Sequence, residues 1–333
     1  MLKRTRFSLV LAVCLSVCSF VALAAPDVSG PRLASPLVVV QDALTGKILF
    51  SKNSDTSVSM ASLTKLMTAM VFLDGPTEWL DLPVTIDDTD VDTLKHSSSR
   101  VPIGSIWTRR ELLHLALMAS DNRAAHALGR VYPGGVSGMT KIMNAKARSM
   151  GLTATFFEDT SGLSPNNRTT PLELAYMTSH AAQYALIREF STDLGETFYK
   201  DGKTLVFKNT NAVVRDQKWP SLWLSKTGFT NEAGRCVTMM GRLAGKDITL
   251  VLMAGVSSAA RTLDIQRVQH WLDGSEFQLP VLVQSKVRAA KTLHAMVKKK
   301  VRVAKTSHVK TRAAKTSQAL AKISKKSSKT RAT

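Results

Sequence analysis

The sequence predicts an α+β fold in which strands from both ends of the folded region share one sheet, with helices between them. β-rich runs occupy residues 37–41 and 47–51 near one end, and 236–243 and 248–255 near the other. Between these two pairs of runs, apolar residues recur at helical spacing in segments that begin at capping residues. Strand-rich ends around a helical middle are typical of this class.

The first elements are a hairpin and two helices. Residues 42–46, Asp-Ala-Leu-Thr-Gly, are turn formers between the first two strands. Apolar residues at helical spacing predict a helix over 62–73. A capping box, with Thr108 three residues before Glu111, predicts the start of a second helix that continues towards Val131.

The later elements follow from similar signals. A helix is expected over 139–150, where Gly151 stops it, and another begins at Thr170 with Pro171 in its first turn. A strand is expected over 204–207. The hairpin of residues 236–255 comes next, and an amphipathic helix over 262–272 closes the fold.

The charge of the 333-residue chain is concentrated at its ends. Its formal net charge is +20, from 45 Lys and Arg against 25 Asp and Glu. Sixteen of those cations lie from Lys286 onward, and no acidic residue follows Glu276. Three more, Lys3, Arg4 and Arg6, lie at the N-terminus. The middle of the chain is therefore nearly neutral, and its charge does not indicate a nucleic-acid-binding protein.

Residues 1–24 have the pattern of a secretory signal. Three cations precede the apolar run 7–23, which ends in Ala-Leu-Ala. We expect cleavage near Ala24 and a periplasmic location, because no later run is apolar for long enough to span a bilayer. The exported chain would keep one thiol, Cys236, and hence no internal disulfide.

The remaining sequence divides into two parts. Residues 25–280 are long enough for one domain with a large core. Residues 281–333 have low complexity, many cations and no acids, which predicts a disordered tail. Our hypothesis is that the tail attaches loosely to anionic lipid or to the cell-wall polymer. A solvated extension without a partner is the alternative, and no nucleic acid is expected for an exported chain.

Three short motifs in the neutral region could carry chemistry. Ser62 and Lys65 are three residues apart, so their side chains can meet on one face of a helix. A lysine with a lowered pKa can then take the serine proton. The spacing alone is weak evidence, because an ordinary helix start gives it too.

The second and third motifs are also ambiguous when taken singly. Ser120-Asp121-Asn122 falls within the helix expected from Thr108, and it indicates either a solvated bend or a hydroxyl and an amide facing a cleft. Lys226-Thr227-Gly228 precedes the last hairpin, and suits either an exposed turn or a strand edge against which a substrate backbone lies.

Together and in this order, the motifs S-x-x-K, S-D-N and K-T-G are the signature set of penicillin-recognising serine enzymes. The phrases at 61–69, 159–163 and 226–231 make the chain resemble the low-molecular-mass D-alanyl-D-alanine peptidases of family S11, and most of all their endopeptidases. The resemblance covers about residues 35 to 272. It implies the serine transpeptidase/β-lactamase-like fold, an antiparallel sheet flanked by helices plus a mostly helical lobe.

The resemblance also implies roles for residues. Ser62 would be the nucleophile, Lys65 its general base, and Ser120 a proton relay to the leaving amine. Desolvation and the neighbouring Lys226 cation would lower the pKa of Lys65. The remaining expected roles are substrate binding by Asn122, Lys226, Thr227 and Gly228, and an oxyanion hole from the backbone N–H groups of Ser62 and Phe229.

The implied substrates are peptidoglycan peptides, and β-lactam antibiotics would acylate the same serine. No cofactor is expected. No metal site is expected either, because the histidines form no metal-binding pattern and the aspartates near residue 90 lack the glycine and glutamate of a calcium loop. A carboxypeptidase remains the alternative to an endopeptidase. A β-lactamase is less favoured, since its water-activating glutamate has only Glu158 as a candidate. A binding protein without catalysis is the remaining class.

Overall fold

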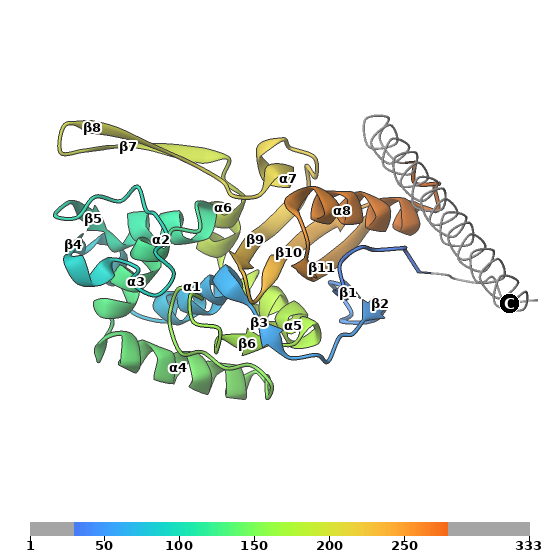
Figure 1. Ribbon diagram of the computed structural model, residues 1–333, viewed down its shortest axis with the longest axis horizontal. Helices are drawn as coiled ribbons and strands as arrows, with labels where there is room; N and C mark the ends of the chain where they lie inside the picture. The colour runs from blue at the N-terminus through green and yellow to red at the C-terminus, as the bar shows by residue number, and fades with distance from the viewer. Residues whose placement is uncertain (1–29, 279–333) are drawn as a thin grey trace, which may run out of the picture. The chain divides into compact units, whose positions relative to one another are not determined.

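The computed structural model describes residues 30–278 (Figure 1). The expected signal peptide and the expected basic tail lie outside the described residues. The chain divides into one compact unit that ends at Asp273 and a second that begins at Gly274. The fold below is that of the first unit.

A five-stranded antiparallel sheet has the order β2-β1-β11-β10-β9. Its strands are β1 (Leu37–Asp42), β2 (Ile48–Lys52), β9 (Leu222–Thr230), β10 (Gly234–Leu243) and β11 (Lys246–Gly255). Leu37 lies opposite Met253, and Asp42 opposite Ile248, where β1 pairs with β11. The prediction that the terminal strands share one sheet is therefore confirmed, and β9 is an edge strand.

Each face of the sheet is covered by helices, because successive side chains along a strand point to opposite faces. Val38 and Val40 of β1 belong to the cluster that includes Ile265 and Val268 of α8 (Ser258–Asp273). Val39 belongs instead to the larger cluster on the other face. That cluster includes α5 (Pro171–Ala181), which packs on the sheet, and the helical part of the molecule.

The helical part lies between β2 and β9 in the sequence. Its helices are α1 (Lys65–Leu73), α2 (Arg109–Met118), α3 (Asn122–Arg130), α4 (Gly135–Ser149), α5, α6 (Ala185–Thr192) and α7 (Ala212–Arg215), with 3₁₀ turns η1 (Ala61–Thr64), η2 (Thr77–Asp81) and η3 (Asp88–Asp90). Three two-stranded sheets pair β3 (Val58–Ser59) with β6 (Arg168–Thr169), β4 (Pro83–Thr85) with β5 (Ile106–Thr108), and β7 (Gly195–Lys200) with β8 (Lys203–Lys208). The strand expected over 204–207 is confirmed as β8. It pairs with β7, which the sequence analysis did not predict. The apolar side chains of the two strands pack near Trp107.

Local capping signals gave the starts of α2 and α5 correctly, whereas the helices expected from residues 139 and 262 begin at Gly135 and Ser258. Thr108 and Glu111 form the expected capping box, and Thr170 caps α5 with Pro171 in its first turn. The prediction of one helix from Thr108 towards Val131 is wrong. The helix ends at Met118, and a new one begins at Asn122, because two short polar residues between them adopt non-helical backbone conformations.

Asp264 of α8 holds the start of the described chain against the sheet. Its carboxylate is fully buried and accepts hydrogen bonds from Ala34 N (2.9 Å), Ser35 N (2.7 Å) and Ser35 Oγ (2.8 Å). Arg267 Nη1 donates a further bond at 2.8 Å. The segment that leads into β1 therefore depends on one side chain more than 200 residues away in sequence.

Replacing Asp264 with alanine should lower the free energy of unfolding by about 2–4 kcal/mol, because buried donors lose their only strong acceptor. Asp216→Ala is the matched control. It breaks the exposed Asp216–Lys218 ion pair and should leave the unfolding midpoint almost unchanged. Urea unfolding of both variants measures the difference, and equal midpoints would contradict the anchoring role.

Candidate active site

The three sequence motifs meet at one cavity of about 410 Å³. Its walls come from η1, from the break between α2 and α3, and from the edge strand β9. The predicted residues that line it are Ser62, Ser120, Asn122, Thr227, Gly228 and Phe229. The two predicted lysines lie behind this surface, each with about 1% of its area exposed. All the residues singled out from the sequence are thus brought together.

Lys65 makes three hydrogen bonds that connect separate parts of the chain. Its Nζ donates to Ser62 Oγ at 2.9 Å, to Asn122 Oδ1 at 2.7 Å and to the Ser161 carbonyl at 2.6 Å. Ser62 lies in the 3₁₀ turn η1 and Lys65 begins α1, so the expected α-helical placement of Ser62 is wrong by one turn. The contact persists because residues i and i+3 eclipse each other in a 3₁₀ turn.

Burial shifts the pKa of the Lys65 ammonium. Removal from water lowers its pKa from 10.5 to about 7, although the acids Asp159, Asp121 and Asp92 act in the opposite direction. A substantial fraction of Lys65 is therefore neutral near pH 7. An amine in that state, 2.9 Å from a hydroxyl, can accept its proton.

Lys226 is the second buried amine. Its Nζ donates to Ser120 Oγ at 2.8 Å and to the Thr227 carbonyl at 3.1 Å. Its pKa is lowered well below 10.5, first by burial and then by the positive charges of Lys65 and Arg261. The two causes expected to lower the Lys65 pKa therefore have different outcomes. Desolvation lowers the pKa of Lys65, whereas the repulsion between the two lysines lowers the pKa of Lys226.

The break between α2 and α3 exposes Ser120 to the cavity. Ser120 has a φ of +57°, a conformation that is uncommon outside glycine. Asp121 then caps α3 by accepting from Ala124 N at 2.9 Å. Burial raises the pKa of Asp121. The strained residue is therefore held between the end of one helix and the cap of the next.

A chain of hydrogen bonds orients the Asn122 amide. Asn122 Nδ2 donates to Ser97 Oγ at 2.8 Å, and that hydroxyl donates to Asp92 Oδ2 at 2.6 Å. The amide oxygen is thereby directed at Lys65. Neither Ser97 nor Asp92 was identified from the sequence as part of a site, because no motif connects the 91–101 segment to Asn122.

The 159–163 segment supplies the third acceptor of Lys65. Asp159 accepts hydrogen bonds from Ser161 N and Ser164 N, each at 2.6 Å, and so shapes a tight loop. Gly162 in this loop has a φ of +86°, and a Cβ there would lie 1.9 Å from the Ala61 carbonyl oxygen. Only glycine allows the loop to lie against η1. The sequence marked this segment by resemblance, without giving it a function.

The edge strand β9 passes very close to Ser62. A Cβ at Gly228 would lie 3.2 Å from Ser62 N, so a side chain there would crowd the space in front of that N–H. The next residue, Phe229, is 47% exposed, and the Arg235 guanidinium lies 3.7 Å from the centre of its ring. This arrangement leaves room for a small group between Ser62 N and β9.

Sequence reasoning missed five further residues that line the cavity: Ala119, Thr210, Arg235, Ser258 and Arg261. Thr210 Oγ1 and Thr227 Oγ1 share a hydrogen bond of 2.6 Å. Arg261 is nearly buried, donates to the Cys236 carbonyl at 2.9 Å, and has a pKa lowered to about 10 by burial. The cavity therefore combines two buried lysines with two arginines, which favours an anionic ligand.

Other reactive groups lie apart from this cavity. Cys236 is fully buried among apolar side chains, and burial raises the pKa of its thiol to about 11. Within residues 30–278, His114, Asp193 and Glu196 bring one potential metal-ligand atom each within 4.8 Å of one another. None of the three lines the cavity at Ser62.

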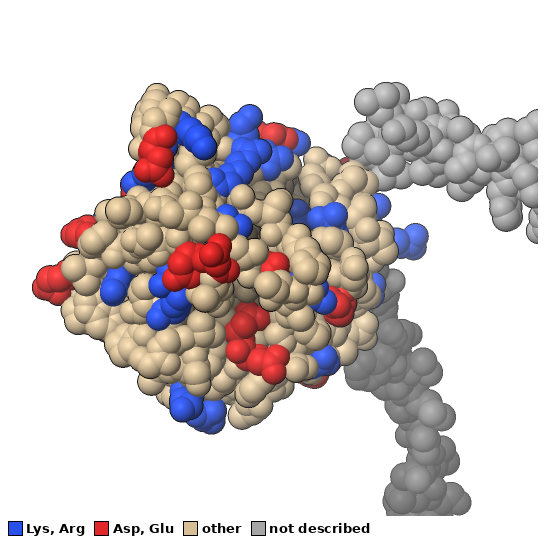
Figure 2. Space-filling view, turned by 60° about the vertical axis from the view of Figure 1, so that its left-hand side comes forward, with Lys and Arg blue, Asp and Glu red and all other residues tan. Residues whose placement is uncertain are grey.

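The surface of the described body fits a nearly neutral protein. Acidic and basic side chains intermingle on the face shown in Figure 2. Among residues 30–278, no helix is long and apolar enough to cross a membrane. A strong positive field does not dominate the face shown, in agreement with the division of charge in the sequence.

Comparisons with known proteins agree with this geometry. A D-alanyl-D-alanine endopeptidase of Pseudomonas aeruginosa is 39% identical over 267 residues, which cover 78% of this chain and 85% of that protein. One of Escherichia coli is 37% identical over 273 residues, covering 80% and 87%. The crystal structure of the Streptomyces K15 DD-transpeptidase superposes with a TM-score of 0.68 at 27% identity, covering 73% of this chain and 98% of that one.

The family assignment rests on most of the chain. Residues 24–257 match peptidase family S11, described as D-alanyl-D-alanine carboxypeptidase. The fold, the convergence of the three motifs and the relatives therefore agree, and the chain belongs to peptidase family S11.

Proposed function

We propose that this chain is a serine DD-peptidase that hydrolyses D-alanyl bonds in peptidoglycan cross-links through an acyl-enzyme on Ser62. The observation that carries the proposal is the Lys65 amine, buried, with a pKa of about 7, and 2.9 Å from Ser62 Oγ. A serine becomes nucleophilic when a neighbouring base takes its proton. Lys65 is that base.

Acylation then follows from the contacts. Ser62 Oγ attacks the carbonyl carbon of the scissile bond while its proton moves to Lys65 Nζ. The negative charge that develops on the carbonyl oxygen is stabilised by the N–H groups of Ser62 and Phe229. The C–N bond then breaks as Ser120 gives its hydroxyl proton to the leaving amine and takes a replacement from Lys226, which donates a hydrogen bond to it. Water finally attacks the acyl carbonyl and gives a proton to Lys226, while Lys65 returns its proton to Ser62 Oγ, so that the acid is released and the free enzyme is restored.

The cationic side of the cavity binds the carboxylate beside the scissile nitrogen. Lys226 and Thr227 of β9 hold it, with Arg261 nearby, while the Asn122 amide binds the peptide and Gly228 leaves space for its backbone. A cross-link and a free pentapeptide both have such a carboxylate. Two relatives named endopeptidase, at 37–39% identity, favour the cross-link, whereas a carboxypeptidase is the alternative.

Deacylation should be slow with penicillin, which makes β-lactams acylating inhibitors. A class A β-lactamase needs a glutamate that activates the deacylating water. The Glu158 carboxylate instead accepts hydrogen bonds from Ser164 and Asn166, and Glu158 does not line the cavity at Ser62. The geometry therefore favours a peptidase.

The chain functions in the periplasm in this proposal, after removal of residues 1–24. Residues 25–280 form the catalytic domain, and the basic tail 281–333 attaches to anionic lipid or to cell-wall polymer. Charge supports this assignment, because 16 cations without an acid give the tail a strong attraction for polyanions.

Ser62→Ala should abolish labelling by fluorescent penicillin and lower the cleavage of cross-linked muropeptide dimers about a thousandfold or more, because no other group can form the acyl-enzyme. Ser54→Ala changes a half-buried serine whose hydroxyl bonds to the neighbouring Asp55, and it should leave both activities unchanged. Retained labelling of the Ser62 variant would contradict the assigned nucleophile.

In a parallel digestion with the unaltered protein, release of D-alanine from pentapeptides without loss of dimers would favour the carboxypeptidase instead.

The acylation rate with penicillin should rise with pH through about 7 and level off above it. Only neutral Lys65 can accept the serine proton, so each pH unit below its pKa of about 7 lowers the rate about tenfold. Stopped-flow acylation between pH 5.5 and 9 measures the profile. Lys246→Ala, an exposed lysine of β11, should leave the midpoint in place. A midpoint near 10 would show that Lys65 is not desolvated.

Truncation after Pro280 should abolish sedimentation with anionic vesicles or cell-wall sacculi at low salt, while penicillin acylation stays unchanged. The binding of the full chain should fall steeply with added salt, because exposed charges are screened. Equal sedimentation of the truncated and full chains would contradict attachment through the tail.

A further inference from the structure

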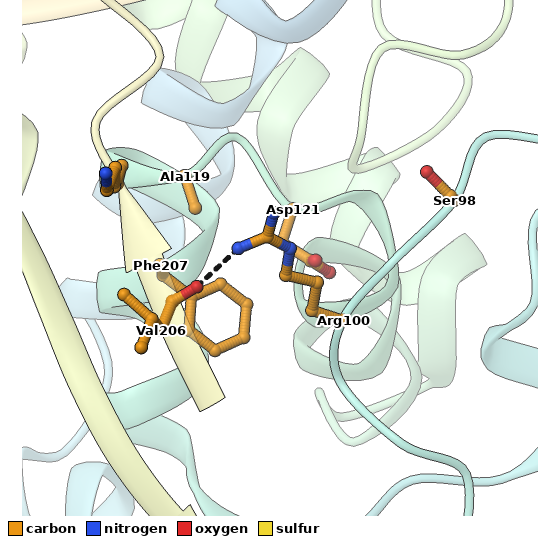
Figure 3. A pocket seen from close by; sticks show the side chains of 7 residues that line it. Ser98, Arg100, Ala119, Asp121, Val206 and Phe207 are labelled. Carbon is orange, nitrogen blue, oxygen red and sulfur yellow. Dashed lines mark hydrogen bonds between the residues drawn. The ribbon is translucent and has the colours of Figure 1, made fainter. Parts of the chain in front are cut away.

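A second cavity, of about 540 Å³, opens beside the candidate active site. One wall is the segment with Ser98 and Arg100, and the opposite wall is residues 206–208 of β8 (Figure 3). Ala119 and Asp121 complete it. No step of the proposed reaction described so far uses this space.

The two cavities adjoin each other. Ala119 lines both of them, and the next residue, Ser120, faces the leaving amine in the proposed reaction. On the other wall, Lys208 of the second cavity is two residues before Thr210 of the first. Thr210 N donates to the Met118 carbonyl at 3.1 Å and so ties the two walls together. The second cavity therefore begins where the leaving group would depart.

The second cavity also presents cations. Arg100 reaches across its opening, where Nη1 donates to the Val206 carbonyl at 2.5 Å (Figure 3). Lys208 is exposed, and among residues 30–278 its ammonium has no ion-pair partner. The carboxylate of Asp121 is turned inward, towards Ser99 Oγ and Ala124 N. The accessible charge in this cavity is therefore mainly positive.

A cross-link and a free pentapeptide differ on this side of the scissile bond. When terminal D-alanine is released, the leaving group ends at the carboxylate held by Lys226. When a cross-link is cut, the leaving amine belongs to a whole second peptide, which bears further carboxylates of its own. That peptide must continue past Ser120 into the space that adjoins the cavity at Ser62.

We propose that the second cavity is the subsite for the leaving peptide of a cross-link, with Arg100 and Lys208 binding its carboxylates. The inference rests on the proposed endopeptidase function and deepens it, because it gives a physical reason for preferring cross-links. The exposed side chain of Val206 packs along the aliphatic part of the same peptide.

The test compares three charge reversals in the full chain: Lys208→Glu, Arg100→Glu and, as matched control, Lys203→Glu. Lys203 is exposed at the far end of the same strand and does not line the cavity. Lys208→Glu should lower kcat/KM for anionic muropeptide dimers about tenfold, and Arg100→Glu at least as much, whereas Lys203→Glu should not change it. High salt should reduce these differences.

Penicillin acylation, which has no leaving peptide, is the second readout for every variant. A rate within twofold of the unaltered protein shows that the site at Ser62 is intact, so a loss on dimers alone supports the subsite. Equal dimer cleavage by Lys208→Glu and Lys203→Glu would overturn it. If the unaltered protein leaves dimers intact but releases D-alanine, the proposed endopeptidase function fails first, and the subsite fails with it.

Discussion

The removal of one ammonium group from water is the constraint on which the rest of this site depends. Lys65 is almost completely buried, and a buried charge without partners would be very costly. The cost is reduced in two ways: the pKa falls to about 7, and three oxygen atoms accept from Nζ. Those oxygens belong to η1, to the start of α3 and to the loop after Asp159. The fold has to bring two distant segments, those of Asn122 and Ser161, to the nitrogen atom of Lys65.

Residues with strained backbone conformations cluster around Lys65. Ala61 and Ser120 have positive φ angles, and Gly162 has another in a loop that lies against the Ala61 carbonyl. Such conformations cost free energy, and they persist only where the surrounding structure enforces them. Here a buried helix cap at Asp121 and the hydrogen bonds to Asp159 provide that enforcement. The strain positions the Ser120 hydroxyl and the Ser161 carbonyl, which lie beside the two buried lysines.

Periodicity and capping allowed much of the scaffold to be predicted from the sequence. The terminal strands, the box at Thr108 and the cap at Thr170 depend on neighbouring residues, so local patterns reveal them. A bend at Ser120 was one of two interpretations of the polar triplet 120–122, and the sequence could not decide between them, because the positive φ of Ser120 is stabilised by tertiary contacts. The order of three motifs identified the residues that carry the chemistry. Arg261, Thr210 and the Asp92–Ser97 chain have no motif, and only the folded structure places them at the cavity.

The two buried lysines have different partners, Ser62 for Lys65 and Ser120 for Lys226, but their charges are coupled because they lie in one site. Two positive charges in a poorly solvated space repel each other, so the protonation of one disfavours that of the other. A substrate carboxylate at Lys226 and Thr227 would favour the charged form of Lys226. The negative charge of that carboxylate offsets the positive charge of Lys226. The neutral form of Lys65, which is the form that can accept the Ser62 proton, is therefore maintained mainly by burial. The same coupling explains why a lysine, whose charge depends on burial and on its neighbours, suits the position three residues after the nucleophile.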